Sequence, residues 1–172
     1  MALLLTAPLV ACGDDGPAVS DAEAARAVCG TLVAWTNDVT ETVNGTQEQM
    51  QEGADLRALM LDAVDVVIAR TEALGEEEAA LALPDSEGGE TLAEVLAAGR
   101  EAAQEDLDGF RAEVAAIPTP DPEATNYRKA QLVVELEKPR SLVKPDASGD
   151  LGDPDLEAAL QAEASCRFVI RT

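Results

Sequence analysis

Apolar side chains recur at helical spacing along most of this chain, and this period restricts its fold more than any other feature. The first stripe repeats every three or four positions over about five turns, and consists of Ala25, Val28, Cys29, Leu32, Trp35, Val39 and Val43. Such spacing places one face of a helix against a core. Ser20 and Glu23 form a capping-box pattern at its start, and Asn44-Gly45 predicts its end.

Four further segments continue the helical pattern. We predict helices over 55–74 and 91–117, a fourth from Asp121-Pro122 to Glu137 or Lys138, and a last from Asp153-Pro154 through Cys166. The 55–74 segment is apolar nearly all round, which predicts a helix buried on two sides. The chain shows no repeat and no strand-like alternation. We therefore predict an all-α, up-down bundle of four or five helices.

The charge and the composition exclude several classes of function. Lys and Arg total 12 against 34 Asp and Glu, a net charge of −22, and such a field repels phosphate backbones. We therefore expect no nucleic-acid partner. The absence of histidine excludes Ser-His and Cys-His catalysis and His-ligated zinc. We predict no enzymatic activity and no cofactor.

The first thirteen residues carry a separate pattern. An apolar run of roughly eight residues, too short to span a bilayer, leads into Leu9-Val10-Ala11-Cys12 and an acidic loop. This order resembles the lipobox of bacterial lipoproteins, in which the cysteine becomes the mature N-terminus and carries the lipid. The resemblance implies a signal peptide over 1–11, a lipidated Cys12 with a tether over 12–19, and a helical-bundle domain over 20–172.

The same resemblance implies a location outside the cytoplasm, on the outer face of the cytoplasmic membrane. Lipid chains on Cys12 would then bind the protein to that membrane. The alternative is an apolar N-terminal arm that packs on the fold, with Cys12 an ordinary thiol. No Lys or Arg precedes Leu3, so we expect translation to start upstream of Met1, because signal peptides begin with a basic region.

Two cysteines remain once Cys12 is assigned to lipid. In an exported protein, Cys29 and Cys166 are expected to form a disulfide that joins the terminal helices. It would be worth about 4–5 kcal/mol in the chain-entropy description, and two free thiols are the alternative. The chain is also similar to small Ala-rich, His-poor lipoproteins of actinobacteria, many of which pair a cysteine in the first helix with one near the C-terminus.

An acidic segment over 146–157 partly resembles a calcium-binding EF-hand loop. Asp146, Ser148, Asp150 and Glu157 occupy ligand positions of a twelve-residue frame, but Leu151 stands where the turn requires glycine. These four residues are a weak metal candidate, for which we expect no affinity tighter than roughly millimolar. The alternative is a solvated loop whose aspartates cap the following helix.

Two other charge patterns each have a functional and a structural interpretation. Asp62 and Asp65 lie in the most apolar helix, where they could form a cation-binding or acid-base pair in the core, or meet solvent or an arginine. Basic residues concentrate over 128–144. They could dock an anionic partner or offset neighbouring acidic helices.

These observations predict a non-catalytic, lipid-anchored binding protein of the cell surface. Its partners would be the membrane, through the lipid on Cys12, and a protein or cell-wall component whose identity the sequence does not give. The alternative is a lipoprotein that binds a small ligand or a cation, using an inter-helix pocket or the acidic loop 146–157.

Overall fold

In a computed structural model of this chain, the described residues form five α-helices and one short 3₁₀ helix. They are α1 (Asp21–Gln49), α2 (Leu56–Ala79), α3 (Glu87–Ala115), α4 (Thr125–Leu142), α5 (Pro154–Ala162) and the 3₁₀ helix η1 (Ala164–Phe168). The structure describes residues 19–51, 53–119, 121, 123, 125–145 and 151–170, and these contain no strand. The predicted all-α bundle is confirmed.

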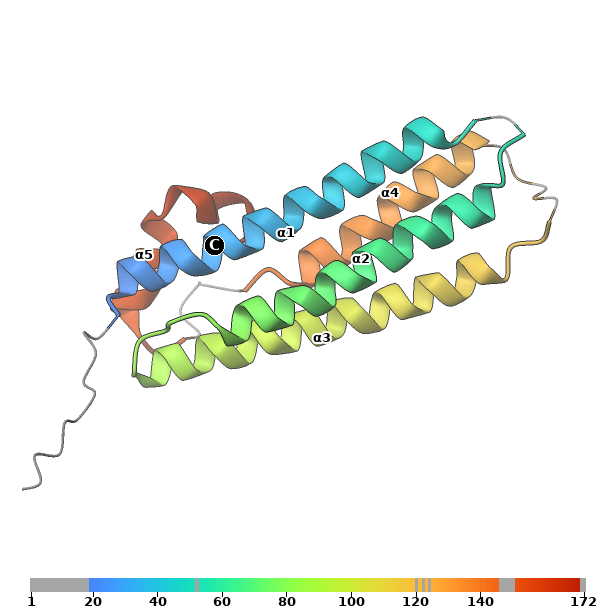
Figure 1. Cartoon of the computed structure of the whole chain (residues 1–172). Helices are drawn as coiled ribbons and strands as arrows, with labels where there is room; N and C mark the ends of the chain where they lie inside the picture. The colour runs from blue at the N-terminus through green and yellow to red at the C-terminus, as the bar shows by residue number, and fades with distance from the viewer. Residues whose placement is uncertain are drawn as a thin grey trace, which may run out of the picture.

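The four long helices run up and down, and α5 with η1 packs on the first half of α1 (Figure 1). α2 lies against both α1 and α3, and α4 contacts all three. We call the end where α1 begins and α5 lies the proximal end. The opposite end, where α1 leads into α2 and α3 into α4, is the distal end. The 29 residues of α1 place these ends about 43 Å apart at the usual helical rise.

The predicted stripe of α1 forms the core. All its members are buried except Val43, which is partly buried and packs on the same core. Trp35 is 4% exposed and donates its indole N–H to the Thr71 hydroxyl at 3.2 Å, which joins α1 to α2. α2 lies between two helices, as its apolar sequence predicts, but its outer face meets solvent. Val66 on that face is 47% exposed.

Two helices continue beyond their predicted ends. α1 passes through Asn44-Gly45 to Gln49, because Thr46 and Met50 beyond that pair are buried. Their packing outweighs the roughly 1 kcal/mol that glycine costs inside a helix. α2 likewise passes through Gly75 to Ala79. A Cβ at Gly75 would lie 3.0 Å from Nε of Arg100, so the glycine gives this arginine room to cross α2.

α3 begins earlier than the predicted Thr91. Ser86 accepts a hydrogen bond from the Gly89 N–H and starts the helix at Glu87. We expected Gly88 and Gly89 in the connection between the second and third helices. They form the first turn of α3 instead, where neighbouring atoms lie very close to their backbone. A Cβ on Gly88 would lie 2.2 Å from Cβ of Asp153, and one on Gly89 would lie 2.1 Å from a backbone oxygen. The helix ends at Ala115, two residues before the predicted end.

α4 continues where a stop was predicted, through Pro139 to Leu142. The last turn is retained because it packs closely on α3: a Cβ on Gly99 would lie 2.6 Å from the Leu142 carbonyl oxygen. The start of α4 also differs, since the helix begins at Thr125 rather than directly after Asp121-Pro122.

The last predicted helix is divided in two. α5 ends at Ala162, and Glu163 adopts an extended conformation. The Glu163 carboxylate accepts hydrogen bonds from the backbone N–H and the hydroxyl of Ser165, at 3.2 and 3.0 Å. These bonds begin η1, which carries Cys166, and they hold the pKa of Glu163 below its usual range. A side chain that caps the next turn therefore interrupts the helix.

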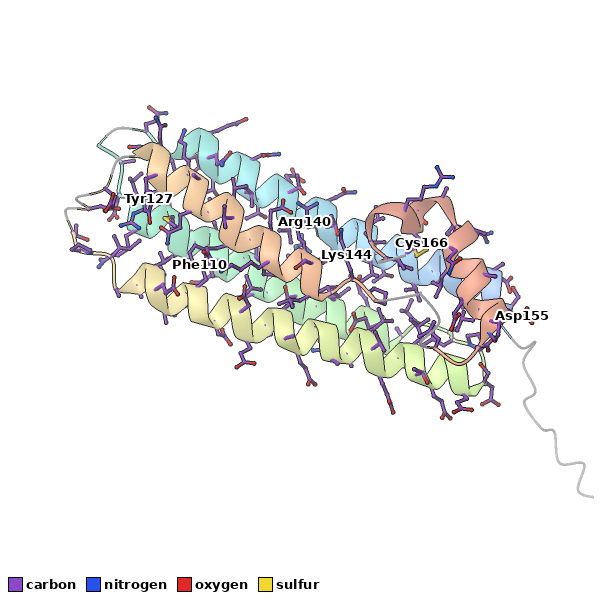
Figure 2. The ribbon with its side chains drawn as sticks, turned by 180° about the vertical axis from the view of Figure 1, so that it is seen from behind. Phe110, Tyr127, Arg140, Lys144, Asp155 and Cys166 are labelled. Atoms are coloured by element: carbon purple, nitrogen blue, oxygen red, sulfur yellow. A yellow bond between two sulfur atoms is a disulfide. The ribbon has the colours of Figure 1, made fainter. Side chains whose placement is uncertain are left out.

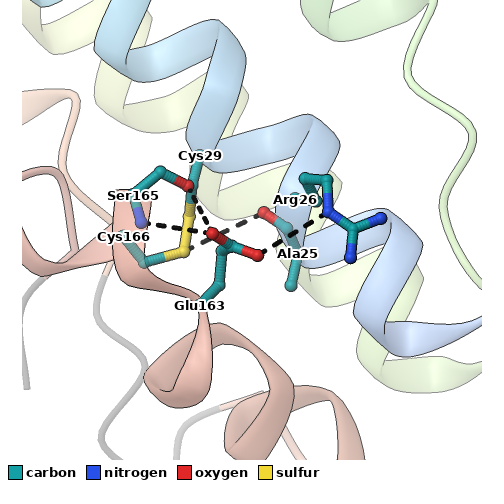
Figure 3. Close-up of a disulfide and its surroundings, with 6 residues drawn as sticks. All are labelled: Ala25, Arg26, Cys29, Glu163, Ser165 and Cys166. Carbon is teal, nitrogen blue, oxygen red and sulfur yellow. Dashed lines mark hydrogen bonds and ion pairs between the residues drawn. A yellow bond between two sulfur atoms is a disulfide. The ribbon is translucent and has the colours of Figure 1, made fainter.

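The Cys29–Cys166 disulfide is present and joins α1 to η1 (Figure 3). The two Cα atoms are 5.0 Å apart, within the usual range for disulfides, and both residues are buried. Sγ of Cys166 lies 3.9 Å from the Ala25 carbonyl oxygen, a packing contact because a disulfide sulfur carries no proton. The Arg26 guanidinium adds a 3.9 Å ion pair to Glu163.

Candidate functional site

A cavity of about 920 Å³ lies at the distal end of the bundle. Its walls come from the α1–α2 connection, the first residues of α2, the α3–α4 connection and the first residues of α4. Met50 and Leu56, 1% and 7% exposed, belong to the core and also line the cavity. Figure 2 shows Tyr127 at this end of the bundle and Asp155 at the other.

A nearly buried ion pair stabilises the α3–α4 wall of the cavity. Arg128 donates from Nε and Nη2 to the two carboxylate oxygens of Asp121, at 2.7 and 3.0 Å. A third nitrogen donates to the Gln131 side chain at 2.7 Å, and the guanidinium stacks 5.3 Å from the Tyr127 ring centre. The Arg128 hydrogen bonds lower the pKa of Asp121. The pair therefore joins the α3–α4 connection to α4, and its two charges are held in fixed positions.

The other wall is built on the start of α2. Gly53 has φ of 85° and turns the chain there, a conformation that favours glycine. Asp55 then accepts a hydrogen bond from the Ala58 N–H at 3.1 Å and caps α2. On the α1 side, the Gln47 side chain donates to the Lys129 carbonyl at 3.2 Å and fixes α4 beside the end of α1.

Asp62 and Asp65 do not meet in the core, so their functional interpretation is not supported. Both are exposed. Asp65 accepts from Arg111 of α3 at 2.5 Å, with both side chains about half exposed. This contact agrees with the structural interpretation, in which an arginine pairs with the carboxylate. The arginine belongs to α3 and not to α1 or α2. The core lies on the opposite side of α2.

The weak metal candidate is described only in part, since Asp146, Ser148 and Asp150 lie outside the described residues. Glu157 is described, and its carboxylate accepts a hydrogen bond from the Leu151 N–H at 3.1 Å. Leu151 itself is 1% exposed. Glu157 therefore closes the loop onto α5, and we found no metal-binding group of three or more acidic or thiol side chains within the described ranges.

The basic segment 128–144 does not form one surface. Arg128 is buried in its pair with Asp121, while Lys138 pairs with Glu135 and Arg140 with Glu137 along α4. Lys129 lines the distal cavity. These local pairs agree with the interpretation that the cluster offsets acidic neighbours, while Lys129 and Lys144 form no ion pair within the described residues.

One further buried group lies away from the cavity. Glu78, with a side chain 8% exposed, accepts from Nε of Arg100 at 3.0 Å and joins α2 to α3. Burial raises the pKa of this carboxyl. This pair connects α2 to α3 beside Gly75.

Sequence reasoning did not find the distal cavity or the Asp121–Arg128 pair. The pattern marked Asp121 only as a helix cap, and the partner seven residues away gave no local signal. A cavity at the end of a bundle depends on where two connections meet in space. The residues that line the cavity have no repeating spacing in the sequence, so no pattern identifies them.

Three predictions concern residues outside the described part: the lipidated Cys12, the signal peptide over 1–11 and most of the tether over 12–19. Within the described part, no helix combines the length and the apolarity needed to cross a bilayer. No protein-family model, curated protein or solved structure matches this chain.

Proposed function

We propose that this chain is a non-catalytic, lipid-anchored binding protein of the cell surface, with its binding site at the distal end. One observation carries this proposal: the distal cavity lies at the opposite end of the bundle from the residues that follow the tether. A lipid on Cys12 would hold the proximal end at the membrane. α1 would then place the cavity about 43 Å farther out.

The non-catalytic role is supported by the chemistry of the cavity. A general acid or base works best with a pKa near the operating pH. The pKa of Asp121 is shifted away from neutrality by Arg128, so its carboxylate acts as a fixed charge. The chain has no histidine that could supply acid-base chemistry in its place.

A small-ligand role is the second candidate, and the size of the cavity favours it. Sites for small molecules usually enclose about 300–1,000 Å³, and the distal cavity is at the upper end of this range. The polar side chains on its walls, including Gln51, Thr119 and Asn126, suit a polar ligand.

Photo-crosslinking in living cells tests the proposed binding end. Benzoylphenylalanine replaces Tyr127, which is 53% exposed at the distal end, or Asp155, which is exposed at the proximal end as the matched control. We expect one discrete cell-envelope adduct from position 127 and not from 155. Equal adducts from both positions would contradict the proposal. Failure at 127 would contradict a macromolecular partner and leave the small-ligand role as the better account.

A further inference from the structure

We infer that the distal cavity binds an oxyanion, a carboxylate or phosphate group, between Arg57 and Lys129. This inference rests on the proposed function, because it names the ligand chemistry of the same binding end. Both cations line the cavity from different helices, Arg57 as the second residue of α2 and Lys129 in the second turn of α4. An anion between them would bridge the two walls.

Neither cation is neutralised by a carboxylate in the described part of the chain. The basic residues that do form ion pairs within 4.0 Å are Arg26, Arg70, Arg100, Arg111, Arg128, Lys138 and Arg140. Acidic residues outnumber basic ones 34 to 12, so most cations find a partner. Arg57 and Lys129 have no such partner among the described residues and line the same cavity, so both are available to an external anion.

The acidic residues on the same walls are largely engaged elsewhere. Asp55 accepts the Ala58 N–H, and Asp121 accepts both Arg128 nitrogens and the Glu123 N–H. Of the described carboxylates lining the cavity, this leaves Glu123 without such a hydrogen bond. With Asp121 paired to Arg128, the carboxylates of Asp55 and Glu123 remain beside the two cations, so the described lining is close to neutral on a chain of net charge −22.

The helix starts strengthen the local positive field. α1, α3 and α5 begin at the proximal end, and each has two acidic residues in its first turn. α2 and α4 begin at the cavity and have none. Acidic residues normally stabilise a helix N-terminus and cations oppose it. At the start of α2 the N-cap Asp55 supplies one carboxylate, while Arg57 in the first turn opposes the helix dipole, a cost that a bound anion would lower.

Carboxylate and phosphate groups share the chemistry that this pair would recognise. A guanidinium donates two parallel hydrogen bonds to either group, and an ammonium adds a point charge. The hydroxyl of Thr125 and the amide of Asn126 lie on the same wall and can donate further hydrogen bonds. The net charge of −22 repels anions at a distance, but this repulsion is screened beyond about 8 Å at physiological ionic strength.

Calorimetric titration of the detergent-solubilised full chain tests the inference, with citrate and inorganic phosphate as separate probes. We expect saturable binding of at least one probe, and the stronger one identifies the group as carboxylate or phosphate. Arg57→Gln or Lys129→Gln should each weaken it about tenfold or more, as the loss of a charge-assisted hydrogen bond does. Lys144→Gln and Arg167→Gln are the matched controls, because they remove the same charge elsewhere and should change the affinity less than twofold.

Two results would overturn the inference. One is the absence of saturable binding of either probe up to tens of millimolar. The other is equal weakening by the control variants, which would show a response to net charge alone. Unchanged melting temperatures of the cavity variants would exclude loss of folding as the cause. If crosslinking from position 127 succeeds while both probes fail, the binding end stands and only the oxyanion assignment is wrong.

Discussion

Reduction of the Cys29–Cys166 disulfide should lower the melting temperature by roughly 8–20 °C, at about 2–4 °C per kcal/mol for a domain of this size. The bond joins residues 137 positions apart. Closing so long a loop restricts the unfolded chain and is worth about 4–5 kcal/mol in the chain-entropy description. Single domains are stable by only about 5–15 kcal/mol. The bond is therefore a large fraction of the total.

The loss should be felt first at the C-terminal segment. α5 has nine residues, too few to be stable alone, and α5 with η1 packs mainly on α1. Its anchors are Leu156, Leu160 and the disulfide itself. Amide exchange of α5 should therefore rise more than that of α3 on reduction. The control is the double variant Cys29→Ser, Cys166→Ser, whose melting curve should not respond to reductant.

An unchanged melting temperature would contradict this prediction, provided that thiol titration shows the bond to have been present and cut. That result would mean that the packing of α5 and η1 on α1 holds the terminal helices together without the covalent link.

Arg128→Met should destabilise the protein by about 3 kcal/mol, because removing one partner leaves a nearly buried charge uncompensated. The side chains of Arg128 and Asp121 are 9% and 10% exposed. The corresponding fall in melting temperature is roughly 6–12 °C. The control is Arg111→Met, which breaks the exposed pair with Asp65 and should change the melting temperature little, because exposed pairs contribute little.

The pH dependence distinguishes this pair from a general packing effect. Arg128 lowers the pKa of Asp121 below its ordinary 3.8. A lowered folded-state pKa gives stability that is present above the unfolded value and lost as pH falls through the folded value. The difference between wild type and Arg128→Met should therefore be full at neutral pH and shrink below about pH 4. If Arg128→Met does not fold, Asp121→Asn reports on the same pair.

Glu78 contributes a pH dependence of the opposite sign. Burial raises its pKa, so ionising it costs stability as pH rises through the unfolded and then the folded value. Because this cost is common to wild type and Arg128→Met, it cancels in the difference between them. A difference that is independent of pH would contradict the assignment of the Arg128 effect to Asp121.

The bundle was predictable because its signals are local. The α1 stripe identified the face that is buried, and the capping box of Ser20 and Glu23 marked a start that the structure confirms. The cysteine pairing followed from the count of cysteines and the expected compartment. The stripe and the capping box each lie within a few turns of the chain, where helical period and capping chemistry act.

The helix ends were less predictable, because tertiary packing overrides local stop signals. Gly45 and Pro139 lie inside helices since the turns that follow them pack on the core or on α3. Gly88 and Gly89 read as a loop pair, but they form a first turn in which Gly88 lies against Asp153 and Gly89 against the Pro84 carbonyl. No short window of sequence contains Gly88 and Asp153 together.

The candidate site was the least predictable part. The basic residues over 128–144 left two interpretations open, docking of an anionic partner or compensation of acidic helices. Pairing along α4 neutralises much of their charge and leaves Lys129 at the cavity. Its proposed partner Arg57 lies on α2 and carried no signal. Only the meeting of two connections at the distal end brings these residues together.

The intact mass of the protein recovered from membranes tests the central claim most directly, because the orientation of the bundle depends on a lipid at Cys12. We predict a chain that begins at Cys12 and exceeds its polypeptide mass by a diacylglycerol group and an acyl chain. We also predict that Cys12→Ala moves the protein to the soluble fraction. Membrane-bound protein with an unmodified Cys12, or a Cys12→Ala variant that stays on the membrane, would contradict the account.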